Sequence, residues 1–316
     1  MRIRVRFAIG VFILTAAMAR LGARSPESSP ELFAPGVVST EDNEFGPAFT
    51  PDGNTLFFCR TGPTRTQTQV ILYSEKKAGK WMEPKVAPFS GRYREYDPSI
   101  SPDGRLLVFA STRPGGGRDA SRTDYDLWAC DRTACGWSEP RHLDGVNSPG
   151  NESTTSIASD GTLYFASDRP GGKGNRDLYV SHPIPGGGYG EPQPLVALNT
   201  EGDDSNQWIA PDQSWMIFAS DRPGGFGSLD FYVTRRQAGE WSAPKNLGEK
   251  INDAAAVLTP VVDPSGEWLL YASFRGFADK PLDHTVDFAE FRRLIHAPGN
   301  GLGDIYRIPL RALGLP

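Results

Sequence analysis

The chain alternates short apolar runs with polar turns, and it does so with a regular period. Runs such as Leu106–Ser111 follow an Asp-Gly type of turn and are rich in β-branched and aromatic residues, which is typical of short β-strands. The pattern occurs as FTPDGNTLFFCR, ISPDGRLLVFAS, IASDGTLYFASD, IAPDQSWMIFASD and VDPSGEWLLYAS, and its turn recurs every 51 to 57 residues. A repeat of this length that contains several strands indicates a propeller blade.

Each repeat predicts four strands. The first precedes the turn, as in Pro98–Ser101, and the second follows it. A glycine-rich loop such as SDRPGGFGSLDFYV then leads into the third strand. The fourth strand contains a proline, which fits an outer edge strand because proline is tolerated mainly at edges. The fourth-strand segments are Trp81–Val86, Trp137–Leu143, Tyr189–Leu195 and Trp241–Leu247.

The fifth repeat lacks a fourth strand of its own, because the chain ends soon after DIYRIPLRAL. Pro30–Ser39 aligns with Pro140–Ser148, so we expect it to pair beside the third strand of the last blade. The sequence therefore predicts an all-β fold, a five-bladed propeller of four-stranded antiparallel blades closed by an N-terminal strand. The insertion 277–300 predicts one short helix packed against one face, with a decorated loop, a lid or a docking element as its roles.

The first 23 residues have the pattern of a cleaved signal peptide, with a basic start, the apolar run Phe7–Ala19 and small residues after it. The apolar run is shorter than the roughly 20 residues of a membrane span, so we expect no span in the mature chain. We expect residues 24–29 to form a disordered lead and residues 30–316 to form a single propeller domain. The predicted location is periplasmic or secreted.

Composition and charge narrow the classes of partner. The formal net charge is −5 and no lysine-arginine stripe occurs, which argues against a nucleic-acid partner. No known nucleophile, zinc or phosphate-binding motif is present, so the sequence names no catalytic residue and no metal site. The four histidines fall at unrelated positions of the repeat, namely His142, His182, His284 and His296.

Because the sequence predicts export, we expect the cysteines to lie in an oxidising environment that allows disulfides. Cys130 and Cys135 flank DRTA at a predicted hairpin tip, which favours a disulfide between them. Cys59 is left over in an apolar run and is expected to be a buried thiol.

A set of carboxylates recurs eight residues before the turn aspartate. This position opens the first strand, which lines the channel of a propeller, so we predict a carboxylate ring at one channel mouth with Asp97 and Asp203 nearby. Such a ring would favour a cation such as Ca²⁺, a basic peptide end or raised carboxyl pKa values. The same acids could instead accept hydrogen bonds from neighbouring loops, or act as catalytic acids. The set is Glu44, Glu95, Glu152 and Asp204, and the fifth repeat has Val257 there.

Three further sets of repeated residues are expected to be structural. The turn aspartates hydrogen-bond their own backbone, as is usual for this residue type in turns. The arginines of S-x-R match in number the aspartates before the third strand, which predicts an arginine–carboxylate pair in each blade. The turn aspartates are Asp52, Asp103, Asp160 and Asp212. The arginines are Arg113, Arg169, Arg222 and Arg275, and the strand aspartates are Asp126, Asp177, Asp230 and Asp304.

The pattern [DE]-x-x-P-x-[FI]-S-P-D-G followed by F-A-S-x-R-P-G-G-x-G-x-x-D-L-Y resembles the TolB-like, WD-repeat-like β-propeller repeat of exported bacterial proteins. The resemblance extends over about Glu41–Ile308 and recurs five times. TolB itself has six blades and an extra N-terminal domain, which this sequence does not predict. The resemblance implies interaction with a protein or with glycan of the envelope, without catalysis.

Two functions from different classes follow from these observations. The first is an exported, monomeric, non-catalytic propeller that binds an envelope protein or peptide, with glycan as a further ligand. The alternative is a carbohydrate-active, glycosidase-like enzyme that uses acids at the central channel, and it requires two carboxylates at about 5–5.5 Å or 6.5–9.5 Å. A structural calcium propeller using the same acids is a third option.

Overall fold

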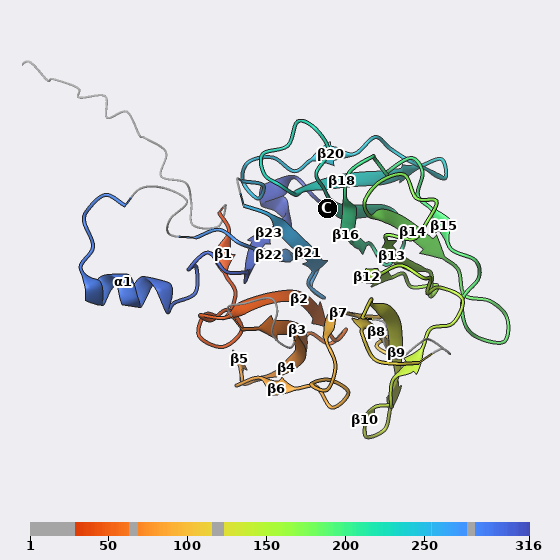
Figure 1. Ribbon diagram of the computed structural model, residues 1–316, viewed down its shortest axis with the longest axis horizontal. Helices are drawn as coiled ribbons and strands as arrows, with labels where there is room; N and C mark the ends of the chain where they lie inside the picture. Colours follow the sequence, from red (N-terminus) through yellow and green to blue (C-terminus); the bar gives the residue numbers. More distant parts are fainter. Residues whose placement is uncertain (1–28, 63–68, 116–122, 254, 277–281) are drawn as a thin grey trace, which may run out of the picture.

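The strands form five antiparallel sheets arranged around a central axis (Figure 1). This computed structural model describes residues 29–62, 69–115, 123–253, 255–276 and 282–316. The first strands of neighbouring sheets contact each other in a closed circuit, so each sheet is a blade with its first strand innermost. The predicted five-bladed propeller is confirmed.

In every blade the first strand pairs with the second across the polar turn, and the second pairs with the third. The connection between the second and third strands is the glycine-rich loop in blades two, three and four. Blade one contains β2 (Asn43–Phe49), β3 (Thr55–Thr61), β4 (Val70–Lys77), β5 (Lys80–Trp81) and β6 (Lys85–Val86). Blade two contains β7 (Glu95–Ile100), β8 (Leu106–Ser111), β9 (Asp126–Thr133), β10 (Gly136–Trp137) and β11 (Arg141–His142). Blade three contains β12 (Glu152–Ile157), β13 (Leu163–Ser167), β14 (Asp177–Ser181) and β15 (Gln193–Pro194).

The last two blades follow the same plan. Blade four contains β16 (Asp204–Ile209), β17 (Trp215–Ser220), β18 (Asp230–Gln237), β19 (Glu240–Trp241) and β20 (Lys245–Asn246). Blade five contains β21 (Val257–Val262), β22 (Trp268–Ser273), β23 (Asp304–Pro309) and β1 (Glu31–Leu32). The short 3₁₀ helix η3 (Leu310–Leu313) follows β23.

The outer strand of blades one, two and four differs from the prediction. It is interrupted into two short pieces, and both pieces pair with the third strand of the blade. In blade one the interruption contains Pro84, which has no N–H to donate to the neighbouring strand.

The N-terminal strand closes the ring as expected. Glu31 and Leu32 of β1 lie opposite Arg307 and Tyr306 of β23. Arg307 also forms an ion pair with Glu31 at 2.6 Å, and the backbone N–H of Phe33 donates to Ile305 at 2.8 Å. The last blade is therefore built from both ends of the propeller.

The hydrophobic core lies between the blades. Each of five buried clusters combines residues of two adjacent blades, so the core consists of inter-blade layers. The layer between blades one and two contains Phe57, Phe109, Cys59 and Cys130. Burial raises the pKa of the Cys130 thiol to about 12, which makes it unreactive.

The predicted disulfide is absent, and this corrects the sequence interpretation. Cys130 and Cys135 are both free thiols, the first buried and the second exposed. Cys130 lies within β9 and packs into the core, while Cys135 lies in the turn that joins β9 to β10. The two side chains therefore belong to different environments although their positions are close in sequence.

The insertion forms the helix α1 (Phe288–Ile295). Asp287 is its N-cap, and the Asp287 side chain accepts from the backbone N–H of Glu290. The expected packing against one face is wrong. None of its residues is buried, Phe288 is 74% exposed, and Figure 1 shows α1 lying beside the propeller rather than on it. His296, just after the helix, lies within hydrogen-bonding distance of Glu41, with Nδ1 2.6 Å from the carboxylate oxygen Oε2.

The expected signal peptide of residues 1–23 lies outside the described residues. Among the helices within the described ranges, none has the length and apolar character required to cross a bilayer.

Candidate functional site

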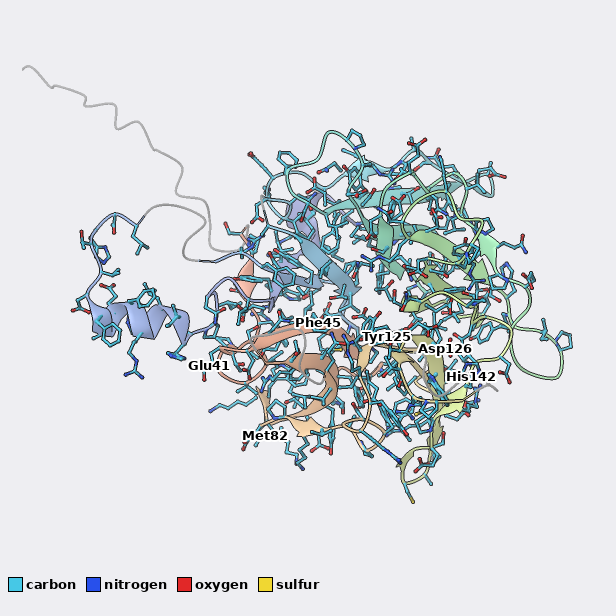
Figure 2. The ribbon with its side chains drawn as sticks, viewed as in Figure 1. Glu41, Phe45, Met82, Tyr125, Asp126 and His142 are labelled. Carbon is cyan, nitrogen blue, oxygen red and sulfur yellow. The ribbon has the colours of Figure 1, made fainter. Side chains whose placement is uncertain are left out.

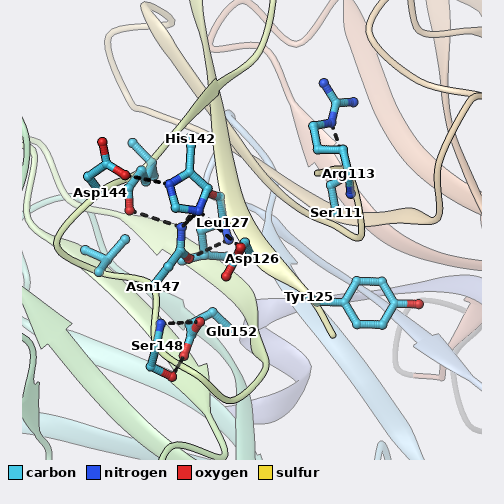
Figure 3. Close-up of polar contacts among 12 residues, drawn as sticks. Ser111, Arg113, Tyr125, Asp126, Leu127, His142, Asp144, Asn147, Ser148 and Glu152 are labelled. Carbon is cyan, nitrogen blue, oxygen red and sulfur yellow. Dashed lines mark hydrogen bonds and ion pairs between the residues drawn. The ribbon is translucent and has the colours of Figure 1, made fainter. Parts of the chain in front are cut away.

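The four repeated acids lie within the scaffold, fully buried at the start of the first strands. Glu152 accepts from the backbone N–H of Ser148 at 2.9 Å, as Figure 3 shows, and from the Ser167 hydroxyl at 2.8 Å. Arg169 donates to Glu152 at 3.2 Å and to the Val146 carbonyl at 2.6 Å. The acid thus joins the loop before its own strand to the arginine that follows the second strand.

Equivalent contacts hold the other acids. Glu95 accepts from Ser90 at 2.8 Å and from Arg113 at 2.8 Å. Asp204 accepts from Thr200 and from Arg222, the latter at 2.8 Å.

In blade one, Glu44 bonds Thr40 and pairs with Arg60 at 2.9 Å. Burial raises the pKa of Glu44, although the hydrogen bonds from Thr40 and the charge of Arg60 act in the opposite direction.

In the fifth blade the arginine after the second strand also pairs with a carboxylate, but the carboxylate comes from a different position. Val257 occupies the position of the acid, and Arg275 turns instead to Asp253 at 3.0 Å. Asp253 lies four residues before Val257, the same offset at which Thr40, Ser148 and Thr200 precede their acids. The exchange keeps a carboxylate beside the arginine, which is the expected behaviour of a structural ion pair.

None of the four acids lines the open channel, and this corrects the predicted carboxylate ring. Asp203 also lies away from the channel wall, where it pairs with Arg176 at 2.9 Å.

Three of the arginines therefore pair with first-strand acids and Arg275 pairs with Asp253, so the expected pairing with the strand aspartates is wrong. The strand aspartates instead hold the glycine-rich loops. Asp230 accepts from the backbone N–H of Phe226 at 2.7 Å and of Gly227 at 3.0 Å. A Cβ on Gly225 would lie 2.5 Å from Oδ2 of Asp230, so the loop requires glycine there.

The remaining strand aspartates and the turn aspartates also bond locally. Asp177 and Asp304 accept from loop N–H groups, and Asp126 bonds His142 at 3.1 Å within the cluster that includes Asn147 in Figure 3. The turn aspartates Asp52, Asp103, Asp160 and Asp212 each accept from the backbone N–H two residues later, at 2.9–3.1 Å. Hydrogen bonds within the turn lower the pKa of Asp52, Asp103 and Asp212.

A central cavity of about 770 Å³ lies between the blades. The first strands of all five blades line it, and it extends to the turns that follow them, including Pro51, Pro102, Pro211 and Pro264. Figure 2 shows Phe45 near the centre of the ring, whereas Met82 lies at the outer edge of blade one.

One residue in each first strand adopts a left-handed backbone conformation. The first strands are irregular here, because their pairing with the second strands shifts around this residue. A positive φ is costly for residues other than glycine, so the arrangement is imposed by the surrounding structure. We call this set the bulge ring, and it consists of Gly46 (φ 62°), Asp97 (φ 51°), Thr154 (φ 44°), Asn206 (φ 53°) and Thr259 (φ 49°).

Hydrogen bonds connect the bulge ring from blade to blade. The backbone N–H of Asn206 donates to the Thr154 hydroxyl at 3.3 Å, and that of Thr259 donates to Oδ1 of Asn206 at 3.1 Å. The N–H of Gly46 donates to the Thr259 hydroxyl at 3.0 Å. Gly46 has no side chain to continue the series, and the N–H of Asp97 donates to Sγ of Cys59 at 3.1 Å instead.

Asp97 differs from the other bulge-ring residues that have a side chain, because its side chain accepts no backbone N–H of a neighbouring blade among the described residues. Its carboxylate Oδ1 is buried and has no hydrogen-bond partner among the described residues. The residue is 6% exposed and lines the cavity. Burial raises the pKa of Asp97 to about 7, although the positive charge of Arg176 acts in the opposite direction.

The rest of the cavity wall is largely apolar, with some polar groups and aromatic rings among the apolar residues. The hydroxyl of Thr155 is also buried and has no hydrogen-bond partner among the described residues. Trp208 packs edge-on against Trp215, with their ring centroids 4.9 Å apart. Two more carboxylates, Asp212 and Asp263, lie in the turns at the cavity rim and bond within those turns. Within the described part of the chain, no group of three His, Cys, Asp or Glu residues could hold a metal ion.

Sequence reasoning named Asp97 only as a neighbour of the repeated acids, and it missed the other members of the bulge ring. The available signal was positional, because each member lies two residues after the acid position. Their residue types differ, so no shared letter marks them.

Comparison with known proteins places the chain by its fold. No family model and no curated protein matches the sequence. The structure is similar to an α-L-arabinofuranosidase from Lactobacillus brevis, with a TM-score of 0.50 and 11% identity over 86% of this chain and 92% of that chain.

Proteins described as TolB are also among the structural neighbours. The one from Agrobacterium tumefaciens has a TM-score of 0.49 and 17% identity over 85% of this chain and 90% of that chain. The one from Acinetobacter baumannii has a TM-score of 0.46 and 19% identity, over 74% of this chain and 50% of that chain. At such identities the similarity concerns the fold and assigns no activity. The chain has the fold of a five-bladed β-propeller.

Proposed function

We propose that this protein is a non-catalytic binding propeller whose central cavity receives a segment of a protein or peptide partner in the cell envelope. The observation that carries the proposal is the cavity itself, which is about 770 Å³ in volume and presents an unpaired carboxylate on its wall. Concave sites with a few polar groups among apolar and aromatic walls are typical of ligand binding. Envelope location rests on the signal-peptide pattern of residues 1–23.

The cavity does not favour the glycosidase alternative. Glycoside hydrolysis uses two carboxylates that face each other across the substrate. Among the described residues of the first strands, Asp97 is the one carboxylate that lines the cavity, and the two at the rim are held by their own turns. The repeated acids are saturated with hydrogen bonds and ion pairs, so they support the scaffold.

A plugged cavity tests the proposal. Thr155 lines the cavity on blade three, and Thr155→Trp would fill part of that space. Val196 is 69% exposed on the outside of the same blade, so Val196→Trp is the matched control. Both variants and the wild type are used to capture partners from envelope extracts, after circular dichroism has shown that each is folded.

We expect a partner that the wild type and Val196→Trp retain and that Thr155→Trp loses. Equal capture by all three proteins would place the binding surface outside the cavity and refute the proposal. Hydrolysis of a polysaccharide panel by the wild type, abolished in Asp97→Asn, would instead establish an enzyme.

A further inference from the structure

The cavity contains a specific recognition point, and it deepens the proposed function on which it rests. We infer that Asp97 binds a primary ammonium group of the inserted segment, either a lysine side chain or a chain amino terminus. The bulge ring provides the first support. Three of its side chains accept a neighbouring backbone N–H, and Cys59 replaces the one that Gly46 lacks.

The carboxylate of Asp97 takes no part in this hydrogen-bond network. Its Oδ1 has no hydrogen-bond partner among the described residues, although the residue is 6% exposed. An unpaired buried carboxylate is costly unless a ligand supplies the missing donor. Among the described residues, the structural aspartates Asp177 and Asp304 also have an unpaired Oδ1, but in each the Oδ2 atom accepts from a loop N–H group.

The structure makes room for this side chain. A Cβ at Gly46 would lie 2.9 Å from Oδ1 of Asp97 and 3.1 Å from Sγ of Cys59. Glycine at position 46 thus leaves space for the carboxylate beside blade one. The space adjoins the cavity, because both residues line it.

The surroundings favour an ammonium over other cations. A calcium ion takes six to eight oxygen ligands, usually with several carboxylates, whereas Asp97 is the one carboxylate that the described residues of the first strands present to the cavity. An ammonium offers three donors on a compact group. The carboxylate of Asp97 and the hydroxyl of Thr155, which also has no partner among the described residues, are acceptors on adjacent first strands.

A peptide panel tests the inference directly. The probes are blocked tripeptides, acetylated and amidated, with lysine, norleucine, Nε-acetyl-lysine or arginine between two glycines, and triglycine amide with a free amino terminus. Binding is followed through the fluorescence change of the cavity tryptophan Trp208, in the wild type, Asp97→Asn and Asp212→Asn. Asp212→Asn removes a carboxylate from the rim of the same cavity and so controls for general charge attraction.

We expect an ammonium-bearing probe to bind about 10- to 100-fold more tightly than the norleucine and acetyl-lysine probes, the range of a charge-assisted hydrogen bond. Asp97→Asn should abolish this preference, and Asp212→Asn should keep it. The lysine and triglycine probes decide between a side chain and a chain terminus.

Other results would overturn the inference. They are equal binding of charged and neutral probes, tighter binding of arginine, an equal loss in both variants, or no saturable binding of any ammonium probe at millimolar concentration. These failures are distinguishable from failure of the proposed function. If Thr155→Trp loses a captured partner that Asp97→Asn retains, the cavity binds that partner without an ammonium contact at Asp97.

Discussion

Replacing Asp97 by asparagine should flatten the pH dependence of the protein's stability. Burial raises the pKa of Asp97 from 3.8 to about 7, while Arg176 opposes the shift. Tyr96 and Tyr125 also lie close enough to sense the carboxylate charge, and burial keeps both phenols neutral in this range. Cys59, buried beside Asp97, stays a thiol for the same reason.

The sign of the effect follows from proton linkage. A carboxyl whose pKa is higher in the folded state holds its proton more tightly there, so it favours folding when protonated. Its contribution is fully present below the unfolded pKa of about 4 and is lost as the pH rises toward the folded pKa near 7. The wild type should therefore lose stability between these two values.

The shift from 3.8 to about 7 sets the size of the effect. At about 1.4 kcal/mol per pKa unit it corresponds to on the order of 4 kcal/mol, of which about 2–3 kcal/mol falls between about pH 5 and pH 8. Water entering the cavity would reduce this value. Asp304, whose pKa burial also raises to about 7, contributes in the same direction in every variant and cancels in the comparison.

The assay is urea unfolding followed by tryptophan fluorescence at a series of pH values. Asp97→Asn should lose less free energy of unfolding than the wild type between about pH 5 and pH 8, by about 2–3 kcal/mol. Asp103→Asn is the control, since hydrogen bonds in its turn lower the pKa of Asp103 and it stays ionised over this range. Parallel curves for the wild type and Asp97→Asn would refute the reasoning.

Three further predictions concern the scaffold. Glu152→Ala should lower the free energy of unfolding by about 3 kcal/mol in urea unfolding, because it leaves Arg169 without its carboxylate, and a change below about 1 kcal/mol would contradict the structural role. Gly46→Ala should cost about 1–2 kcal/mol or more in the same measurement, since φ is 62° and the new Cβ would meet Asp97, whereas an unchanged stability would show that the ring relaxes freely. Cys135 should react with a maleimide in the native protein while Cys59 and Cys130 react only after unfolding, and mass spectrometry showing Cys135 protected would contradict the free exposed thiol.

The fold could be predicted because its determinants repeat along the chain. A turn with an aspartate, a glycine or both marks the joint between the first two strands in all five blades, and the spacing between these turns sets the blade length. The closing strand was also predictable, since Pro30–Ser39 repeats the pattern of another outer segment. Local hydrogen bonding and the period of the apolar runs are both properties of sequence order.

The pairing of charged residues could not be predicted in the same way. Equal numbers of arginines and strand aspartates suggested partners, but Arg169 reaches Glu152 and its aspartate neighbour Asp177 bonds the loop backbone. Which carboxylate an arginine meets depends on how strands stack within the blade, and the sequence count does not contain that geometry. The exchange of Val257 and Asp253 in blade five shows the constraint only once the structure is known.

Asp97 became distinctive for the same reason. In the sequence Asp97 is one acid near four others. In the structure it lies in the bulge ring, where three other side chains accept a backbone N–H from a neighbouring blade and its own Oδ1 has no hydrogen-bond partner among the described residues. Its isolation depends on Gly46 in the next blade and on Cys59 taking over a hydrogen bond. These contacts join positions that are far apart along the chain.

The most direct test of the account is a crystal structure of the protein with the tightest-binding ammonium probe of the peptide panel. The peptide should lie in the central cavity with its ammonium nitrogen about 3 Å from the Asp97 carboxylate. The four repeated acids should keep their present partners, namely Glu44, Glu95, Glu152 and Asp204. A peptide bound over α1, on the outer strands, or against one of those four acids would contradict the account.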